Sequence, residues 1–190
     1  MCSAHDLTQL SVGHNYTELE HHWDLAYGYY RFWESIAQSE GLPALKDSPR
    51  RIFHSFVRGR TYMETSRYDE IKLQADIIRH ELGRVVAVRA MDLLAGANTL
   101  ANLKESPKQA FRLLSQAYGL IYASQFARNA QGKPFITYEE TRKLLQTLEQ
   151  EGGLWDKERL LGEEKAEGSL RHLAAQIGER FGVLLEEIKK

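Results

Sequence analysis

Three histidines and one glutamate near the start of the chain have the spacing of metal ligands. They form the pattern H-x3-E-x2-H-H, which consists of His14, Glu18, His21 and His22. Imidazole and carboxylate groups are ligands that transition metals accept. Glu18 and His22 are also four residues apart, so on a helix they can pair with each other instead. The pattern predicts either a metal or ligand site or a polar pair that is satisfied locally.

The opening of this pattern, His14-x3-Glu18, resembles the proximal helix of haem oxygenases. The resemblance implies haem as a ligand, but the glycine-rich distal stretch of that family is missing from the chain. Helical di-iron proteins carry a Glu-x-x-His motif on each of two helices, and Glu18-x-x-His21 is the one such motif here. We therefore assign no family from these residues, and the cofactor stays unknown.

His80 could supply a further ligand from a second part of the chain. It lies in the apolar stretch 68–95, with Asp76 one helical turn before it and Arg84 one turn after it. Histidine changes charge near neutral pH, so His80 could also carry protons. The alternative is a partly buried structural histidine held by Asp76, because ion-pair networks are also structural.

Arg89 falls in line with Ile78 and Leu82 on the apolar side of the same stretch. A guanidinium group keeps its charge, so its burial requires a carboxylate or an anionic ligand. Asp92 is the local candidate for the carboxylate, and Glu18 is a distant one. Three interpretations stay open: a structural ion pair, an anion-binding site, or a helix that leaves the core and exposes Arg89.

The segment from Lys46 to Arg67 is strongly basic. It contains six cations against two acids, a net charge of +4, whereas residues 1–45 contain one arginine and six acids, a net charge of −5. The candidates for nucleic-acid contacts are Arg50, Arg51, Arg58 and Arg60, with interleaved aromatic side chains for base stacking. The alternative is that the basic segment simply packs beside the acidic first helix.

Composition narrows the classes of protein. The chain has 190 residues, is 43% hydrophobic and carries a net charge of −1, which argues against a dedicated binder of polyanions. The single cysteine, Cys2, excludes an internal disulfide and suits a reducing compartment. No apolar run approaches the roughly 20 residues that cross a bilayer, and the N-terminus lacks a secretion signal. We expect a soluble, cytoplasmic protein that does not bind membranes.

A long helix over about 67–95 is the element that should position the others. Its core stripe at helical spacing consists of Ile71, Ala75, Ile78, Leu82, Val85 and Val86, and Leu73, Ile77, Val88 and Met91 form a second ridge on nearly the opposite side. A helix that is apolar on two sides is packed on two sides. We therefore predict a central helix that contacts at least three others.

Caps and breaks predict the remaining helices. The predicted ranges are 16–39 after a capping box at Asn15 and Glu18, 49–58 ending at Gly59, 107–129 after Ser106, Thr137 to Gly152, a short piece within 154–165, and a last helix capped by Ser169. Residues 1–14 should be irregular and residues 134–136 extended. The prediction is an all-α single domain over residues 1–190, a bundle of five or six helices.

The first helix should be apolar over more than half of its circumference. Leu25, Tyr29 and Phe32 widen its buried face, while Glu20 and Asp24 should see water. Residues 23–33 contain two tryptophans and three tyrosines, which suggests a ligand pocket, an interface or simply a core.

The absence of P-loop, Rossmann, nucleophile-elbow and zinc-protease motifs favours a non-catalytic function. We predict a cytoplasmic helical bundle that binds a protein partner or a small ligand, in a regulatory or assembly role, with homo-oligomerisation as one form of partnership. The candidate ligand-binding residues are Glu18, His22, Tyr29, His80 and Arg89. A nucleic-acid-binding module at Arg50 to Arg67 is the second hypothesis, and a metal or haem protein is the third.

Overall fold

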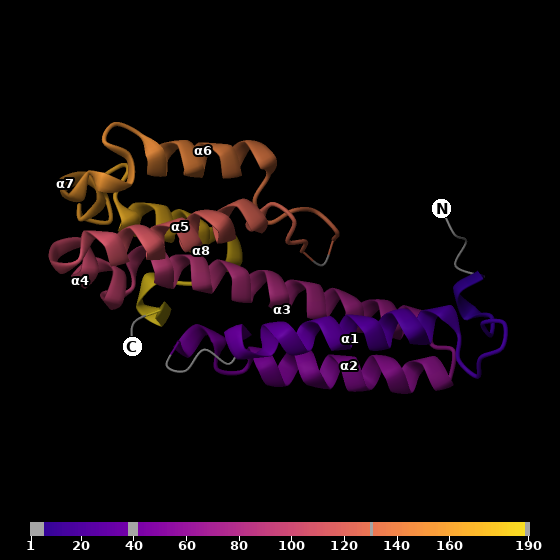
Figure 1. Ribbon diagram of the computed structural model, residues 1–190. Coiled ribbons are helices and arrows are strands. Elements are labelled where there is room, and N and C mark those ends of the chain that lie inside the picture. Colours follow the sequence, from indigo (N-terminus) through magenta and orange to yellow (C-terminus); the bar gives the residue numbers. More distant parts are fainter. Residues whose placement is uncertain (1–5, 38–41, 130, 189–190) are drawn as a thin grey trace.

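The computed structural model describes residues 6–37, 42–129 and 131–188, which are 74% helical and contain no strand. The elements in chain order are η1 (Asp6–Thr8), α1 (Glu18–Ala37), η2 (Pro43–Leu45), α2 (Ser48–Glu64), α3 (Tyr68–Ala95), α4 (Ala97–Glu105), α5 (Pro107–Ser124), α6 (Tyr138–Glu149), η3 (Gly153–Trp155), α7 (Lys157–Leu160), α8 (Leu170–Phe181) and η4 (Leu185–Ile188), where η denotes a 3-10 helix. Figure 1 shows this arrangement. The prediction of an all-α bundle is confirmed.

Helix α3 runs through the whole molecule, about 42 Å at 1.5 Å per residue. It packs against α1 and α2 along its N-terminal half and against α4, α5 and α8 along its C-terminal half. The predicted bounds and the predicted contact with at least three other helices are confirmed. Both apolar sides of α3 are therefore used, but mainly in its C-terminal half.

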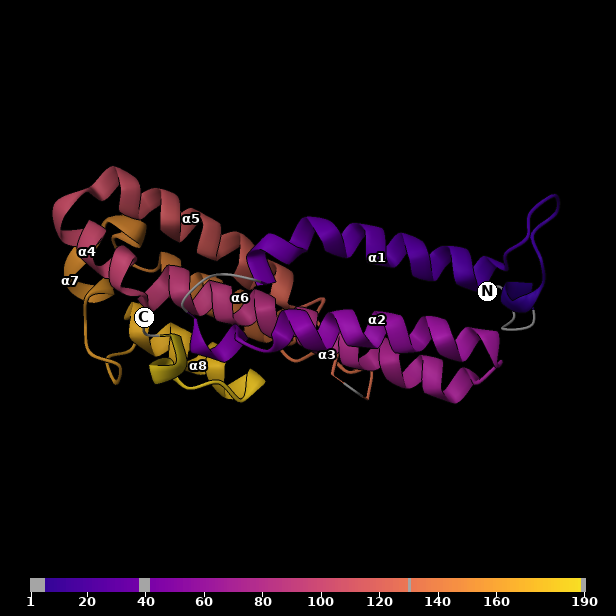
Figure 2. The same ribbon diagram turned by 90° about the horizontal axis from the view of Figure 1, so that it is seen from below.

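Two separate cores share α3. The smaller core belongs to α1, α2 and residues 68–82 of α3, which we call the three-helix arm, and it contains Trp23, Tyr30, Ile52, Phe56, Ile71 and Ile78. The larger core contains α3 from Val85 onward, Leu42, Ala44 and Leu45 at η2, and residues of α4, α5, α6 and α8. Figures 1 and 2 show the arm at one end of the molecule and the larger core at the other. The predicted second apolar ridge of α3 is not buried in the arm, because Leu73 is 53% exposed there.

Helix α2 continues six residues beyond the predicted end at Arg58 and passes through Gly59. A Cβ atom at position 59 would overlap ring atoms Cζ2 and Cη2 of Trp23, so this glycine makes room for an indole. The Trp23 Nε1–H donates to the carbonyl of Phe56 at 3.0 Å, which fixes the ring there. The prediction that Gly59 ends the helix is wrong because the glycine serves packing rather than termination.

Helix α1 begins after a capping box different from the predicted one. The backbone N–H of Thr17 donates to the Glu20 carboxylate at 2.8 Å, and the Glu20 N–H donates to the Thr17 hydroxyl at 3.2 Å. Asn15 and Glu18 do not form this pair, because threonine at position 17 offers the better-matched box two residues later. The predicted end of the helix at Ser39 lies outside the described residues.

The remaining helices follow their caps. Helix α4 is an additional element, and α5 ends at Ser124 rather than near Asn129, because the chain turns there and Arg128 pairs with Pro134 in an isolated bridge. The capping box of Thr137 and the Ser169 cap are confirmed.

Candidate functional site

An apolar groove lies between α1 and α3 in the three-helix arm. Its volume is about 940 Å³. The lining residues are Leu7 and Thr8 of η1, Leu19, His22, Trp23 and Ala26 of α1, Phe56 of α2, and Tyr68, Ile71, Lys72, Ala75, Ile78, Arg79 and Leu82 of α3. Helix α2 thus supplies the floor, and η1 lies at the end nearest the start of α1. The groove is long, open on one side and mostly apolar.

The groove exists because α1 packs more closely on α2 than on α3. Trp23 of α1 reaches Phe56 at a ring-centroid distance of 5.6 Å and fills the space above Gly59. Toward α3, both helices place a small side chain where a larger one would close the gap, Ala26 on α1 and Ala75 on α3. Figure 2 shows α1 running alongside α2 and α3 and set apart from both in this view.

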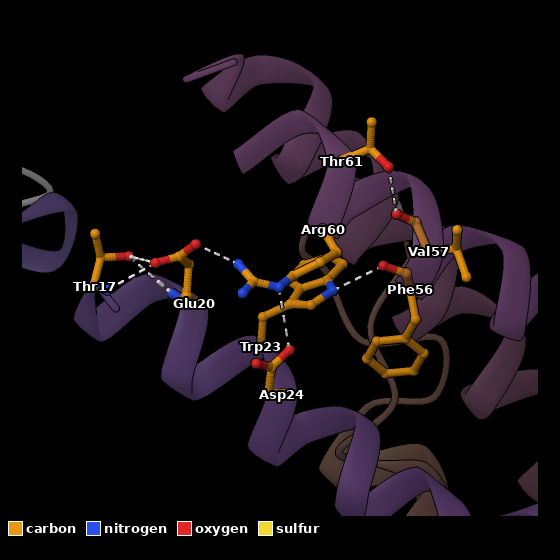
Figure 3. A network of polar contacts seen from close by, with 8 residues as sticks. All are labelled: Thr17, Glu20, Trp23, Asp24, Phe56, Val57, Arg60 and Thr61. Carbon is orange, nitrogen blue, oxygen red and sulfur yellow. Dashed lines mark hydrogen bonds and ion pairs between the residues drawn. The ribbon is translucent and has the colours of Figure 1, made fainter. Parts of the chain in front are cut away.

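A polar network fixes the position of α1 on α2 (Figure 3). The Arg60 guanidinium donates to the Glu20 carboxylate and lies 3.6 Å from the carboxylate of Asp24. The pKa of Glu20 is held below its ordinary value, first by the backbone N–H of Thr17 and then by Arg60. Glu20 and Asp24 therefore face α2. The prediction that they see water holds for Asp24, whose side chain is 62% exposed, but not for Glu20, which is 22% exposed because it packs against Arg60.

The opposite side of α1 carries exposed apolar residues instead. Leu25, Tyr29 and Phe32 are 44%, 69% and 81% exposed. The prediction that they widen the buried face is wrong, because the pairing of α1 with α2 turns them outward. Tyr29, a predicted ligand-binding residue, lines neither the groove nor any other described cavity.

The rim of the groove is cationic. Lys72 and Arg79 of α3 and His22 of α1 line it, and no carboxylate does. Arg79 donates to Asp76 at 2.8 Å. Lys72 is exposed and has no ion pair with any of the described residues. The groove therefore combines an apolar interior with the ammonium group of Lys72, which is available to pair with an anion.

Of the residues predicted to bind a metal, the structure brings only some together. Glu18 and His22 lie 4.0 Å apart with both side chains about half exposed. His14 and His21 each stack on the ring of Tyr16, at ring-centroid distances of 4.7 and 5.4 Å. Within residues 6–37, 42–129 and 131–188, no three His, Cys, Asp or Glu side chains lie where they could hold one metal ion.

His80 lies elsewhere, against the ring of Phe135 at 5.3 Å. Asp76, its expected partner, pairs with Arg79 instead. The structure therefore does not bring His80 to the Glu18 and His22 pair.

Arg89 donates to Asp92 at 2.9 Å, and both side chains are about three-quarters buried. The predicted local carboxylate is the partner found. This geometry is that of a structural ion pair within α3.

Some arginines of the basic segment form ion pairs within the chain, and others line a pocket at the surface. Arg60 pairs with α1, as the packing alternative expects. Arg51 pairs with the buried Glu81 of α3 at 2.9 Å. Arg50 reaches only the exposed Asp47 at 3.4 Å, and Arg58 has no ion pair in the part of the chain that the structure describes.

Two residues with important contacts, Glu81 and Arg159, are not predicted from the sequence. Glu81 lies on the core side of α3, and an acid in that position signals a buried cation partner. Arg159 is 8% exposed, and its guanidinium donates to the carbonyls of Thr147, Leu148, Gly153 and Gly168 at 2.7–3.2 Å. It thereby joins the C-terminal end of α6 to two loops, which no local sequence pattern reveals.

The fold is an all-α bundle with an open, mostly apolar groove on the three-helix arm. The sequence matches the family described as "Domain of unknown function (DUF4856)" over residues 2–184, so the chain belongs to this family. No curated protein and no solved structure matches the chain. Among the described helices, none has the length and apolar character needed to cross a membrane.

Proposed function

We propose that the chain is a binding protein and that the groove between α1 and α3 takes an elongated amphipathic small molecule with an acidic head group. The observation that carries the proposal is the combination of an apolar interior with a cationic rim that lacks carboxylates. Sites for small molecules are typically concave and mostly apolar, with a few polar groups that fix orientation.

The size and shape of the groove support an elongated ligand. Its volume of about 940 Å³ falls within the usual range of about 300–1,000 Å³ for small-molecule sites. Along α3 the lining extends from Tyr68 to Leu82, about 21 Å of helix axis. A molecule with a long apolar tail would cover this length and release water from the half-buried side chains of both helices.

The charge at the rim supports an anionic head group. Lys72 is exposed and has no carboxylate partner within the described ranges. A carboxylate placed beside it would gain a charge-assisted hydrogen bond. Arg79 also lines the rim, although it is already shared with Asp76.

Calorimetric titration of the purified chain with dodecanoate and with dodecanol tests the proposal. Wild type should bind one molecule of dodecanoate per chain. Ala75→Phe should abolish this binding because the new ring fills the groove, whereas Ala101→Phe, on the exposed side of α4, is the matched control and should bind normally. Melting curves by circular dichroism check that both variants fold.

The head-group part of the proposal has its own variant. Lys72→Gln should weaken dodecanoate binding about tenfold, the effect of one charge-assisted hydrogen bond, and should leave dodecanol binding unchanged. Lys108→Gln, an exposed lysine of α5, is the control. Wild type that binds neither compound, or Ala75→Phe that binds as wild type does, would overturn the proposal.

The other hypotheses from the sequence stay predictions. These are a regulatory or assembly role with a protein partner or a second copy of the chain, a cytoplasmic location, and metal or haem binding. The nucleic-acid hypothesis loses Arg60 as a free contact, because Arg60 pairs with Glu20, and it keeps Arg51 only as a side chain that is shared with Glu81.

A further inference from the structure

A second cavity, of about 380 Å³, lies on another side of α2. It is lined by Arg50, Arg51, His54, Ser55 and Arg58 of α2 and by Ile77 of α3, and we call it the basic pocket. Phe56 forms the floor of the groove, and on a helix His54 and Arg58 each lie about 200° around the axis from it. The basic pocket and the groove therefore open on different faces of the arm and share no lining residue.

One arginine of the basic pocket is held in place from behind. The Arg51 guanidinium donates from Nη2 to one carboxylate oxygen of Glu81 at 3.2 Å, and its Nε forms an ion pair with the other oxygen at 2.9 Å. Glu81 is buried and also accepts from the Ser48 hydroxyl at 2.8 Å. Arg51 is thus oriented by a fixed carboxylate, while nearly half of its side chain stays exposed at the pocket.

The other basic side chains of the pocket, Arg50, His54 and Arg58, lack comparable partners. Arg50 has one long contact with Asp47, at 3.4 Å, and is 71% exposed. Neither Arg58 nor His54 has a hydrogen bond or an ion pair with any residue that the structure describes. Arg50, His54 and Arg58 follow one another at i, i+4 and i+8, so the three side chains lie on one side of α2. An anion in the pocket would therefore meet two arginines, Arg50 and Arg58, that have no close carboxylate partner in the described part of the chain.

We propose that the basic pocket binds the phosphoryl group of a small phosphate-bearing molecule. Guanidinium groups match phosphate oxygens with paired, charge-assisted hydrogen bonds. Arg50, Arg51 and Arg58 supply such donors from three positions, and the Ser55 side chain, also in the lining, carries a hydroxyl donor. Ile77 closes the α3 side without adding an acid.

The surroundings favour a single phosphoryl group over a nucleic-acid strand. Strand-binding proteins use a positive groove that follows the backbone over several nucleotides. Beyond the pocket, Arg60 of α2 pairs with Glu20, and Arg67, which follows α2, pairs with Glu70 at 2.7 Å. The positive charge that α2 itself leaves without a close carboxylate partner among the described residues is therefore confined to about two turns of this helix.

Thermal melting and calorimetric titration of the full chain test the proposal with three probes: inorganic phosphate, AMP and a 15-nucleotide oligo-dT. Phosphate should raise the melting temperature more than chloride does at equal ionic strength. AMP that binds more tightly than inorganic phosphate would identify an ester as the preferred source of the phosphoryl group, and equal affinities would identify free phosphate.

Arg58→Gln should weaken phosphate binding at least tenfold, as expected for loss of a charged hydrogen bond. It should keep the fold, because the side chain has no partner to lose. Arg50→Gln is the second variant and should act in the same direction. Arg112→Gln, an exposed arginine of α5, makes the same change in net charge and should bind as wild type does.

Three results would overturn the proposal. The first is equal stabilisation by phosphate and chloride. The second is equal weakening by Arg58→Gln and the Arg112→Gln control, which would show a general effect of net charge. The third is oligo-dT binding far tighter than AMP binding with a steep dependence on salt, which would show a nucleic-acid surface instead.

Discussion

Glu20 has two sets of partners, and both depend on its negative charge. Its carboxylate closes the capping box with Thr17 and also accepts from Arg60 on the neighbouring helix. Glu140 has the same arrangement at the start of α6, with Thr137 and with Arg180 of α8. One acid thus completes a helix end and holds a second helix against it.

The lowered pKa of Glu20 predicts how stability changes with pH. Since the folded-state pKa lies below the ordinary value of 4.5, ionised Glu20 stabilises the fold above about that pH, and this stabilisation is lost as the pH falls through the lowered pKa. Glu20→Gln should reduce the free energy of unfolding by about 1 kcal/mol at pH 7. The difference from wild type should shrink below pH 4.5 in urea titrations. Glu179→Gln, exposed on α8, is the control, and its free energy of unfolding should differ little from that of wild type at any pH. A destabilisation by Glu20→Gln that does not vary with pH would contradict the prediction.

Removal of the Tyr30 hydroxyl should make the protein more stable. Its hydroxyl is buried beside Phe56 and has no hydrogen-bond partner among the described residues. Burial raises the pKa of this phenol to about 12, so the group stays neutral. Because an unpaired buried hydroxyl is costly, Tyr30→Phe should raise the free energy of unfolding by about 1 kcal/mol. Tyr29→Phe, on the exposed side of the same helix, is the matched control and should be neutral in the same urea titrations. A loss of stability in Tyr30→Phe would show that the hydroxyl is paired.

Among the single substitutions, we expect replacement of Arg159 to cause the largest loss of stability. Its buried guanidinium satisfies four backbone carbonyls at the end of α6 and in the loops beside it. Arg159→Met keeps an apolar stem but leaves these oxygens without donors, so the free energy of unfolding should fall by about 3 kcal/mol. Arg112→Met is the exposed control and should stay close to wild type. Chemical denaturation measures both, and equal stabilities would show that water replaces the guanidinium without cost.

At the scale of helices, the contact of α1 with α2 depends on the absence of a side chain at position 59. Gly59→Ala should lower the free energy of unfolding by about 2 kcal/mol, because the new methyl group displaces the Trp23 indole. Gly119→Ala is the matched control: it lies within α5 with open space around it, and it should stabilise by up to about 1 kcal/mol because alanine favours helices. Thermal melting compares the two. In a Trp23→Phe background the cost of Gly59→Ala should become smaller, and an unchanged cost would mean that the indole is not the obstacle.

The sequence predicts helices well where one local cause decides them. The bounds of α3 follow from its long periodic stretch, and Thr137 and Ser169 cap their helices as expected. Gly59 misleads because the same residue type serves termination and close packing, and only the position of Trp23 distinguishes the two.

The candidate site could be predicted only in part. A helix that is apolar over more than half of its surface does not reveal which side packs, so Leu25, Tyr29 and Phe32 are placed on the wrong side. His22 is identified because its residue type stands out. The groove itself depends on how far α1 lies from α3, and its sequence signal is only a pair of alanines, Ala26 and Ala75.

At the scale of the whole molecule, the two cores should differ in stability. The three-helix arm buries few large side chains, and α1 exposes apolar residues on its outer side. Regions with few buried contacts open at lower free energy than the main core. Hydrogen exchange followed by mass spectrometry should therefore show α1 exchanging first, and α5, α8 and residues 85–95 of α3 exchanging last. Equal protection of α1 and α8 would mean that the arm and the larger core unfold together.

One continuous helix serves both cores, and this limits how the length of the chain can change. An extra residue between Ile78 and Val85 would turn one half of α3 by about 100° relative to the other and lengthen it by 1.5 Å. The side chains of one core would then point away from their partners, although no residue in that core had been replaced. Insertions and deletions should therefore be tolerated in surface loops such as the turn between Arg128 and Pro134 but not along α3, where the number of residues matters as much as their identity.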